Sequence, residues 1–305
     1  MKKATLNIAT RKSKLALWQA NFIKSALEKQ HAHLTIELVE IVTDGDREQN
    51  SALTDVGGKS NFVKALQAAL LNHEADIAVH SMKDMSAHDT PYLTLGAIAQ
   101  RADARDAFVS NHYVNIDALP SNAIVGTASP RRACILKSLR PDVEIKLLRG
   151  NVDTRLQKLD RGEYDAIILA AAGLIRLNLE NRIQSYLDET VFTPAIAQGA
   201  IGIECREEDD FIRDLLWFLN DSDTAVCVSA ERRVNQILNG DCHTAIGAYA
   251  TLKNNQLTLS VMIGNTDGTL IVRAEKSDIA ENYLETAESV ANDLIAQGAK
   301  SLMSQ

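Results

Sequence analysis

The sequence predicts an α/β fold over about the first two hundred residues and a smaller α+β part after it. Up to about residue 200, short apolar runs alternate with segments of helical period, which is typical of a mostly parallel sheet with helices on both faces. The last third instead holds consecutive strand-like runs joined by polar turns, which indicates a small antiparallel sheet. The chain has 305 residues, enough for two or three domains.

The first hundred residues are expected to form one α/β domain. Ser13 precedes apolar residues at helical spacing, so we expect it to cap a helix over Ser13–Gln30, and a second helix is expected over Asn61–Leu71. The stretch Thr43–Ser60 is polar and long for a connection, and such loops are usually functional lids or disordered. The expected strands are Thr5–Ala9, Leu34–Val42, Asp76–His80 and Leu93–Ala99.

Beyond Arg101 the alternation restarts. The expected strands are Ala107–Ser110, Ile124–Gly126, Glu144–Leu148 and Tyr164–Ala170, and the expected helices are Arg131–Leu139 and Asn151–Arg161. The C-terminal part is expected to have helices over Thr224–Leu238 and Ala280–Met303, with strands Ile246–Thr251, Gln256–Ile263 and Thr269–Glu275. Domain boundaries are therefore expected near residues 100 and 220.

Charge and composition exclude several classes of protein. The net charge is −8, and residues 201–305 contribute 8 basic against 17 acidic residues, a net −9. Residues 131–182 carry 11 basic against 7 acidic residues, a local +4 that favours a small polyanion over nucleic acid as a ligand. No apolar run approaches the roughly 18 residues of a membrane span. Arg11 and Lys12 interrupt the N-terminal segment where a signal peptide would be apolar, so we expect a cytoplasmic protein.

Seven cations are expected at one edge of the α/β sheets, because each follows an expected strand directly or lies within the next turn. Ligands of open α/β sheets bind at the carboxyl ends of the strands, and helix N-termini there favour anions. One such cation alone is usually an ordinary surface charge, but seven favour a site for a ligand with several carboxylates. These residues are Arg11, Lys83, Arg131, Arg132, Arg149, Arg155 and Arg176.

Two further positions are chemical candidates. Asp84 follows the strand ending at His80 and would be a negative charge among cations, suited to stabilise a positive intermediate, although an ion pair with Lys83 is the simpler interpretation. Cys242 lies in a glycine-containing loop after a helix, where an exposed thiol is a candidate for chemistry and a buried one is only a small apolar residue. The four cysteines have no zinc-type spacing, and we expect no metal site. The Gly57–Ser60 stretch lacks the first glycine of a phosphate-binding loop.

Nine segments together resemble the hydroxymethylbilane synthase family, also called porphobilinogen deaminase. In chain order they are IATRKSKLALWQA (8–20), VGGKSNFVKAL (56–66), DIAVHSMKD (76–84), RDAFVS (105–110), GTASPRR (126–132), LRGNVDTRL (148–156), GEYDAIILAAAGLIRL (162–177), QGAIGIECR (198–206) and AERRVNQILNGDC (230–242). Any one could arise by chance, but all nine in this order are specific, and they extend over most of the chain.

The resemblance implies two α/β domains like those of periplasmic binding proteins, linked by a hinge, plus a small C-terminal α+β domain. Domain 1 would comprise residues 1–100 with about 198–220, domain 2 residues 101–197, and the C-terminal domain residues 221–305. It also implies a monomeric enzyme that joins four porphobilinogen molecules into the linear tetrapyrrole hydroxymethylbilane, with release of ammonia, in haem biosynthesis.

The resemblance further implies roles for individual residues. Asp84 would be catalytic, stabilising the cation that the substrate forms when ammonia leaves. A dipyrromethane cofactor would be attached through a thioether to Cys242. The other cofactor-binding residues would be Ser81, Lys83, Thr127, Ser129, Arg131 and Arg132, and the substrate-binding residues Arg11, Ser13, Arg149, Arg155 and Arg176.

Two alternatives remain open at the level of sequence. A non-enzymatic binding module for a small polycarboxylate would share the two-lobed fold and the cations. A cysteine-dependent hydrolase would need a histidine paired with its thiol, and His243 is only a neighbour of Cys242 in sequence. Either alternative predicts a protein whose mass equals that of its sequence.

Overall fold

The computed structural model describes residues 5–41, 58–240 and 243–303, with side chains from Phe62 onward in the second range. The chain divides into two compact units. Unit 1 comprises Met1–Arg101 with Ala200–Ala225, and unit 2 comprises Ala102–Gly199 with Val226–Gln305. The described part of the chain has no helix long and apolar enough to cross a bilayer.

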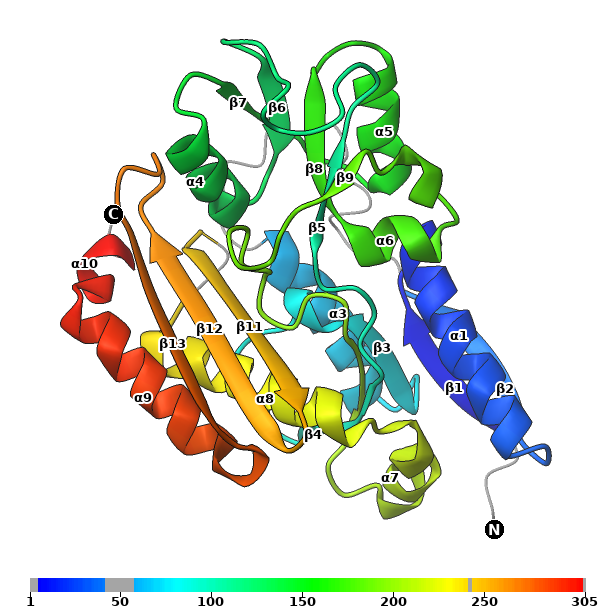
Figure 1. Ribbon diagram of the computed structural model, residues 1–305. Helices are drawn as coiled ribbons and strands as arrows, with labels where there is room; N and C mark the ends of the chain where they lie inside the picture. Colours follow the sequence, from blue (N-terminus) through cyan, green and yellow to red (C-terminus); the bar gives the residue numbers. More distant parts are fainter. Residues whose placement is uncertain (1–4, 42–57, 241–242, 304–305) are drawn as a thin grey trace. The chain divides into compact units, whose positions relative to one another are not determined.

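Unit 1 is built on a five-stranded sheet with the order β2-β1-β3-β10-β4, of which β1, β2, β3 and β4 are labelled in Figure 1. Strand β1 is parallel to β2 and β3, whereas β10 runs antiparallel to β3 and β4. The sheet is therefore mostly parallel, as the sequence predicts, but the antiparallel β10 was not expected as a strand. The strands are β1 (Thr5–Thr10), β2 (Thr35–Glu40), β3 (Ile77–Ser81), β4 (Leu93–Ala99) and β10 (Ile201–Arg206).

Helices cover both faces of this sheet, because alternate strand residues point to opposite sides. Leu6 and Ile8 of β1 belong to the core formed with α1 (Lys14–Gln30) and α7 (Asp210–Leu216). Ala9, the next residue, belongs to the core formed with α3 (Gly58–Leu71). The expected two-sided packing is confirmed.

Unit 2 contains a second five-stranded sheet with the order β7-β6-β8-β5-β9. Strand β6 is parallel to β7 and β8, and β5 is antiparallel to β8 and β9. The helices α4 (Pro130–Leu139), α5 (Val152–Asp160) and α6 (Ala171–Arg176) pack in two separate cores, α4 in one and α5 with α6 in the other. The strands are β5 (Asp106–Val109), β6 (Ile124–Thr127), β7 (Glu144–Leu147), β8 (Ala166–Ala170) and β9 (Ser185–Tyr186).

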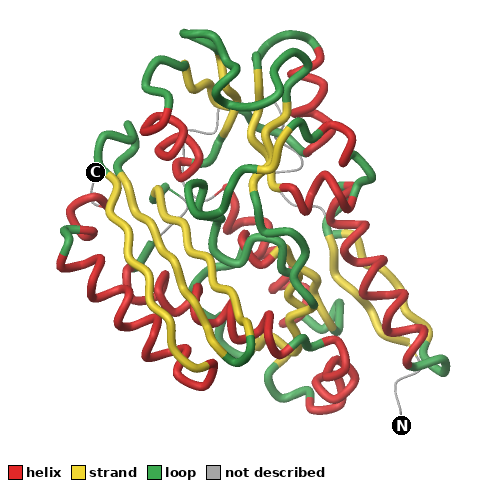
Figure 2. The backbone as a smooth tube through the Cα atoms, in the orientation of Figure 1, coloured by secondary structure: helices red, strands yellow, loops and turns green. Residues whose placement is uncertain are grey.

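Unit 2 also contains a three-stranded antiparallel sheet, β11 (Ala245–Lys253), β12 (Gln256–Gly264) and β13 (Ile271–Ile279). Figure 2 shows this sheet with the C-terminal helix beside β13. The alternation of β12 explains its two contacts: Leu257, Leu259, Val261 and Ile263 pack on helices, whereas Met262 joins the core of α4. The predicted α+β part is confirmed.

The C-terminal helix is not continuous over Ala280–Met303, as the sequence analysis expected. A 3₁₀ turn over Ala280–Asn282 precedes α9 (Tyr283–Ala296), and α10 (Ala299–Met303) follows separately. Gly298 between them has φ of 92°, a left-handed conformation that glycine adopts without steric cost and that ends an α-helix. The expectation of one helix was wrong at this residue.

Candidate functional site

Five of the cations highlighted by the sequence gather at one sheet edge of unit 2. Because β6, β7 and β8 are parallel, the segments that follow them begin at the same edge. Strand β5 is antiparallel, and its first residue, Asp106, lies opposite Ala170, the last residue of β8. A carboxylate therefore stands at the edge where the arginines begin. The five are Arg131 and Arg132 after β6, Arg149 and Arg155 after β7, and Arg176 after β8.

Asp106 binds both arginines of α4 in a buried cluster. Its side chain is fully buried, and Arg131 and Arg132 are 2% and 6% exposed. Arg132 donates from Nη2 and Nε to Asp106 Oδ1 at 2.7 and 3.1 Å. Arg131 forms an ion pair with the same carboxylate, with Nη2 lying 2.7 Å from Asp106 Oδ2. One carboxylate thus holds two guanidinium groups side by side.

The pKa of Asp106 lies well below its usual range. Burial by itself would raise it, but the charges of Arg131 and Arg132 and hydrogen bonds from Arg132 and Gln198 outweigh the burial. The pKa of Arg131 is lowered, by burial first and also by the charge of Arg132, against the attraction of Asp106. An arginine stays protonated at neutral pH in spite of such a shift, so the cluster carries two positive charges and one negative charge.

The segment Thr193–Gly199 supplies further partners for three of the arginines. Arg131 donates from Nη1 to the Thr193 carbonyl at 2.7 Å. Gln198 accepts from Arg132 at 3.5 Å. Arg176 donates from Nη2 to the Gly199 carbonyl at 2.7 Å, and burial lowers the pKa of Arg176 to about 10.

Gly247 on β11 packs directly against this arrangement. A Cβ atom at this position would lie 2.8 Å from the Thr193 carbonyl oxygen and 3.0 Å from both Arg131 Cδ and the Pro194 carbonyl oxygen. The backbone nitrogen of Ala248 donates to the same Pro194 oxygen at 3.1 Å. Only glycine permits this close approach between strand and segment.

The hydroxyls expected to bind the cofactor have structural partners in unit 2. Ser129 is the N-cap of α4 and accepts from the Arg132 backbone nitrogen at 3.4 Å, and Thr127 Oγ1 accepts from the Ser129 nitrogen at 3.1 Å. A hydroxyl that accepts a cap bond keeps its own hydrogen as a donor. Arg149 is exposed, and Arg155 is half-buried with its Nε donating to the Gly150 carbonyl at 2.7 Å.

In unit 1 the remaining candidates follow the parallel strands β1 and β3. Arg11 comes directly after β1, and its guanidinium lies over the Phe62 ring, 3.7 Å from the centroid. Ser13 is the N-cap of α1, as expected, and accepts from the Ala16 nitrogen at 3.3 Å. Because β1 and β3 pair in parallel, the loop after β1 and the turn after β3 lie at the same edge of the sheet.

The turn that follows β3 is a 3₁₀ helix, Met82–Asp84, which holds Lys83 and Asp84 at half-buried positions. Ser81 exchanges hydrogen bonds with the buried Gln19, at 2.8 and 3.2 Å. Met82 is 1% exposed and packs over Gly202 of β10, where a Cβ atom would lie only 2.1 Å from its Sδ. The position of the turn therefore depends on a strand from a distant part of the sequence.

Cys242 and most of the loop Thr43–Ser60 lie outside the described residues. The other cysteines, Cys134, Cys205 and Cys227, are buried, and burial raises the pKa of Cys134 and of Cys205 to about 11. Thiols of this kind are poor nucleophiles, which leaves Cys242 as the candidate. In sequence it stands three residues before Ala245, the first residue of the strand that carries Gly247.

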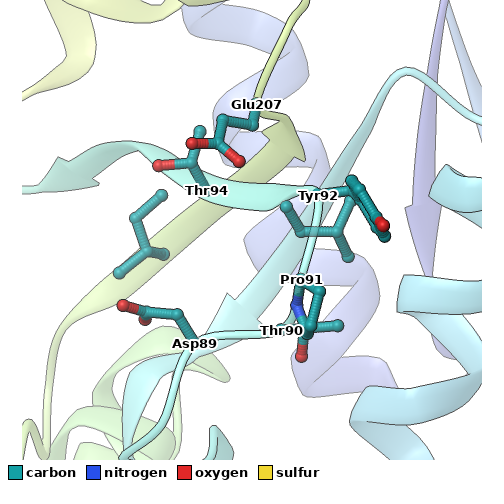
Figure 3. A pocket seen from close by; sticks show the side chains of 8 residues that line it. Asp89, Thr90, Pro91, Tyr92, Thr94 and Glu207 are labelled. Atoms are coloured by element: carbon teal, nitrogen blue, oxygen red, sulfur yellow. The ribbon is translucent and has the colours of Figure 1, made fainter.

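A pocket of unit 1 lies around the start of β4 (Figure 3). It has a volume of about 390 Å³ and is lined by residues around the start of β4, including Asp89, Tyr92 and Glu207. Leu93 of β4 pairs with Arg206 of β10, at the end of the sheet opposite to Ser81. The lining residues include two acids and no cation, which does not suit a carboxylate ligand. Among the residues that the structure describes, no group of His, Cys, Asp and Glu is arranged to hold a metal.

Sequence reasoning missed Asp106 and Gln198. Both lie in segments that carry the family resemblance, RDAFVS and QGAIGIECR, but no local pattern marks either side chain as a partner of an arginine. The full burial of Asp106 would have marked it, because a fully buried acid is almost always paired. That burial is a property of the fold and cannot be recognised in the sequence.

Comparisons with known proteins identify the family of the chain. The family model "Porphobilinogen deaminase, dipyromethane cofactor binding domain" matches residues 6–214, and "Porphobilinogen deaminase, C-terminal domain" matches residues 225–296. The porphobilinogen deaminase of Coxiella burnetii (strain Dugway 5J108-111) is 51% identical over 303 residues, 99% of this chain and 98% of the relative. That of strain RSA 331 / Henzerling II is 50% identical over the same length.

Solved structures with a similar fold have low sequence identity to the chain. The methionine-binding protein MetQ has a TM-score of 0.47 and 12% identity, covering 73% of this chain and 92% of that protein. A periplasmic substrate-binding protein of an ABC transporter from Coxiella burnetii has a TM-score of 0.45 and 11% identity, covering 72% and 94%. The two family models and the identity over almost the whole length decide the assignment: the chain belongs to the porphobilinogen deaminase family.

Proposed function

We propose that this chain is a hydroxymethylbilane synthase, which joins four porphobilinogen molecules into a linear tetrapyrrole with release of ammonia. Membership of the family is the observation that carries the proposal. The arginines at the strand ends support it chemically, since porphobilinogen bears an acetate and a propionate group and guanidinium groups pair with carboxylates in two parallel hydrogen bonds. A non-enzymatic polycarboxylate-binding module would share these arginines, but it would need neither Cys242 nor Asp84.

The substrate carboxylates are assigned to residues after β1, β7 and β8. Arg149 is exposed and Arg155 is half-buried, so both can reach a ligand that arrives from solvent. Arg176 is anchored through Nη2 to the Gly199 carbonyl, which fixes its planar group before a ligand binds. Arg11 and Ser13 would hold a carboxylate at the end of β1, where Phe62 supports the Arg11 guanidinium.

The residues present fit a dipyrromethane with its carboxylate side chains. Arg131 is 2% exposed, yet its Nε has no hydrogen-bond partner, and a buried donor of this kind is satisfied when a carboxylate accepts from it. We assign the cofactor carboxylates to the residues Ser81, Lys83, Thr127, Ser129, Arg131 and Arg132. The attachment is proposed at Cys242 through a thioether. When bound, the dipyrromethane supplies the nucleophilic pyrrole carbon to which the first substrate is joined.

Asp84 is proposed as the catalytic residue. Loss of ammonia leaves positive charge on the substrate, and a fixed carboxylate stabilises that charge by accepting hydrogen bonds from pyrrole N–H groups. The 3₁₀ turn and the contact of Met82 with Gly202 hold the backbone of Asp84, which supports a role that requires a defined position.

The finer organisation is also a proposal. We propose the three-domain division given above, which is supported by the separate core of the three-stranded sheet and its helices. We further propose a cytoplasmic monomer. It is not expected to bind nucleic acid, since the chain is acidic, with a net charge of −8.

Intact-protein mass spectrometry of the wild type and of Cys242→Ser tests the cofactor and the enzyme class together. The wild type is expected to be heavier than its sequence by two porphobilinogen units less two molecules of ammonia, and the variant to match its sequence. After denaturation, one of the four cysteines would no longer titrate as a thiol. A wild type that gains no mass even after incubation with porphobilinogen would refute the synthase assignment and favour the binding module.

Asp84→Asn tests the catalytic assignment. The substitution keeps the size of the side chain and removes its charge, so the variant should fold and carry the added mass. Its turnover of porphobilinogen should fall by about 10² or more, the size of effect expected for a preorganised electrostatic group. Turnover at the wild-type rate would remove Asp84 from the mechanism and leave the cofactor assignment intact.

A further inference from the structure

We infer that Asp106 and Gln198 are positioning residues that hold the Arg131–Arg132 pair ready for the cofactor carboxylates. The inference rests on the proposed function and extends it to two residues that the site assignments do not include. It begins from the fact that one buried carboxylate serves two guanidinium groups of the same helical turn.

Arg132 is immobilised on every nitrogen. Its Nε and Nη2 both donate to Asp106 Oδ1, and Nη1 donates to the Ile168 carbonyl at 2.9 Å. Since the guanidinium is planar and rigid, three anchored nitrogens leave it a single orientation. Its N–H groups that remain are therefore aimed before any ligand arrives.

Arg131 is held at two nitrogens and open at the third. Nη2 pairs with Asp106 Oδ2, and Nη1 donates to the Thr193 carbonyl. Nε is buried and has no hydrogen-bond partner. A purely structural ion pair would leave no such donor, because a buried unsatisfied N–H group costs stability that a closed network avoids. An acceptor from outside the chain accounts for it.

Charge leads to the same conclusion. Two adjacent buried guanidinium groups repel each other and lose hydration, so both could not stay in place without an anion. Asp106 neutralises one positive charge and leaves one. The remaining charge is available to a carboxylate ligand, whereas a second acid in the cluster would have cancelled it.

Gln198 fixes the carboxylate that fixes the arginines. Its Nε2 donates to Asp106 Oδ1 at 2.9 Å and to the Ala104 carbonyl at 2.7 Å. It is 1% exposed. Asp106 Oδ1 thus receives bonds from two directions, from Arg132 and from Gln198, and cannot rotate to follow either arginine alone.

Loading of the cofactor, measured apart from turnover, provides the test. Full-length chain would be purified from cells unable to make porphobilinogen, so that it lacks added mass. Porphobilinogen is then added, and the rate of mass gain is followed over a range of concentrations for the wild type, Asp106→Asn and Gln198→Met. Gln198→Met keeps the side-chain length and removes only the hydrogen bonds, so it serves if Asp106→Asn does not fold. Melting curves establish that each variant is folded at the assay temperature.

Asp76→Asn is the matched control. Asp76 is 3% exposed and accepts from the Asn7 backbone nitrogen at 2.8 Å and from Arg206 at 3.4 Å. It stands just before β3, at the end of the sheet opposite to the Ser81 turn. The control therefore also converts a buried, arginine-paired aspartate to its amide, but away from every assigned residue.

The expected result separates positioning from stability. Folded Asp106→Asn should load on the order of 10²-fold more slowly and reach half its maximal rate at a higher porphobilinogen concentration, since small misplacements of binding groups have effects of this size. Folded Gln198→Met should load roughly 10-fold more slowly than the wild type, and its concentration dependence should shift in the same direction. Asp76→Asn should melt earlier and load as the wild type does.

The inference would be overturned if folded Asp106→Asn loaded at the wild-type rate and with the wild-type concentration dependence. If Asp106→Asn does not fold, the same result in Gln198→Met would overturn it. Equal loss of loading in folded Asp76→Asn would also overturn it, because stability alone would then explain the effect. A wild type that gains no mass would instead refute the proposed function on which the inference rests.

Discussion

Gly202→Ala examines how the turn that carries Asp84 is held in place. Gly202 is a central residue of β10, paired with His80 of β3 and Ile98 of β4. The added Cβ atom would lie 2.1 Å from Met82 Sδ, whereas non-bonded heavy atoms normally approach to about 3.5–4.0 Å. Met82 is 1% exposed, so its side chain can make room only by repacking against its neighbours in the core.

The cost follows from two opposing terms. Forcing an extra methyl group into a well-packed core costs about 1–3 kcal/mol. Alanine in a strand gains about 0.5–1 kcal/mol over glycine, because glycine loses more backbone entropy on folding. The difference spans roughly 0–2.5 kcal/mol, and its midpoint gives a net loss of about 1 kcal/mol of unfolding free energy, a fall of about 2–4 °C in melting temperature.

A double-mutant cycle with Met82→Ala isolates the contact. Met82→Ala alone should cost about 2–5 kcal/mol by leaving a cavity. In the Gly202→Ala background it should cost less, because it also removes the overpacking and the new methyl group fills part of the space. Urea unfolding of the four proteins measures the coupling. Costs that add to within about 0.5 kcal/mol would refute the argument that the two side chains compete for one space.

Two further predictions concern unit 2. Gly247→Ala should lower the melting temperature and slow cofactor loading. Its Cβ would lie 2.8 Å from the backbone oxygen of Thr193, which accepts a hydrogen bond from Arg131. Unchanged loading would show that the Thr193 segment moves without disturbing Arg131. Because the pKa of Asp106 is depressed in the folded protein, its contribution to stability is present above its unfolded pKa of about 3.9 and is lost as the pH falls toward the folded value. Urea unfolding at pH 7 and pH 3 should therefore show a larger gap between wild type and Asp106→Asn at pH 7, and an equal gap at both would contradict the ionised pair.

Much of the fold could be predicted because its signals are local. The alternation of apolar residues located most strands and helices to within one to three residues, and Ser13 was recognised as an N-cap that the structure contains. The cations could be assigned to strand ends by counting along the chain, since parallel strands present their carboxyl ends at one edge. The family resemblance rested on motif order, which is likewise a property of the sequence.

The non-local contacts could not be predicted in this way. Gly298 divides the last helix although the apolar period continues past it, and β10 enters the sheet of unit 1 antiparallel, from more than a hundred residues beyond β3. The side-chain network is of the same kind: Asp106 is 26 residues from Arg132 and 92 from Gln198.

The sequence by itself therefore determined most of the secondary structure, the family and the residue types at the strand ends, because periodicity, caps and motif order are properties of the chain alone. Only the tertiary structure decided that Arg131 and Arg132 share one buried carboxylate and that Met82 rests on Gly202. Burial and strand register arise when distant segments pair, and the energetic value of a charge depends on that burial more than on its neighbours in the chain.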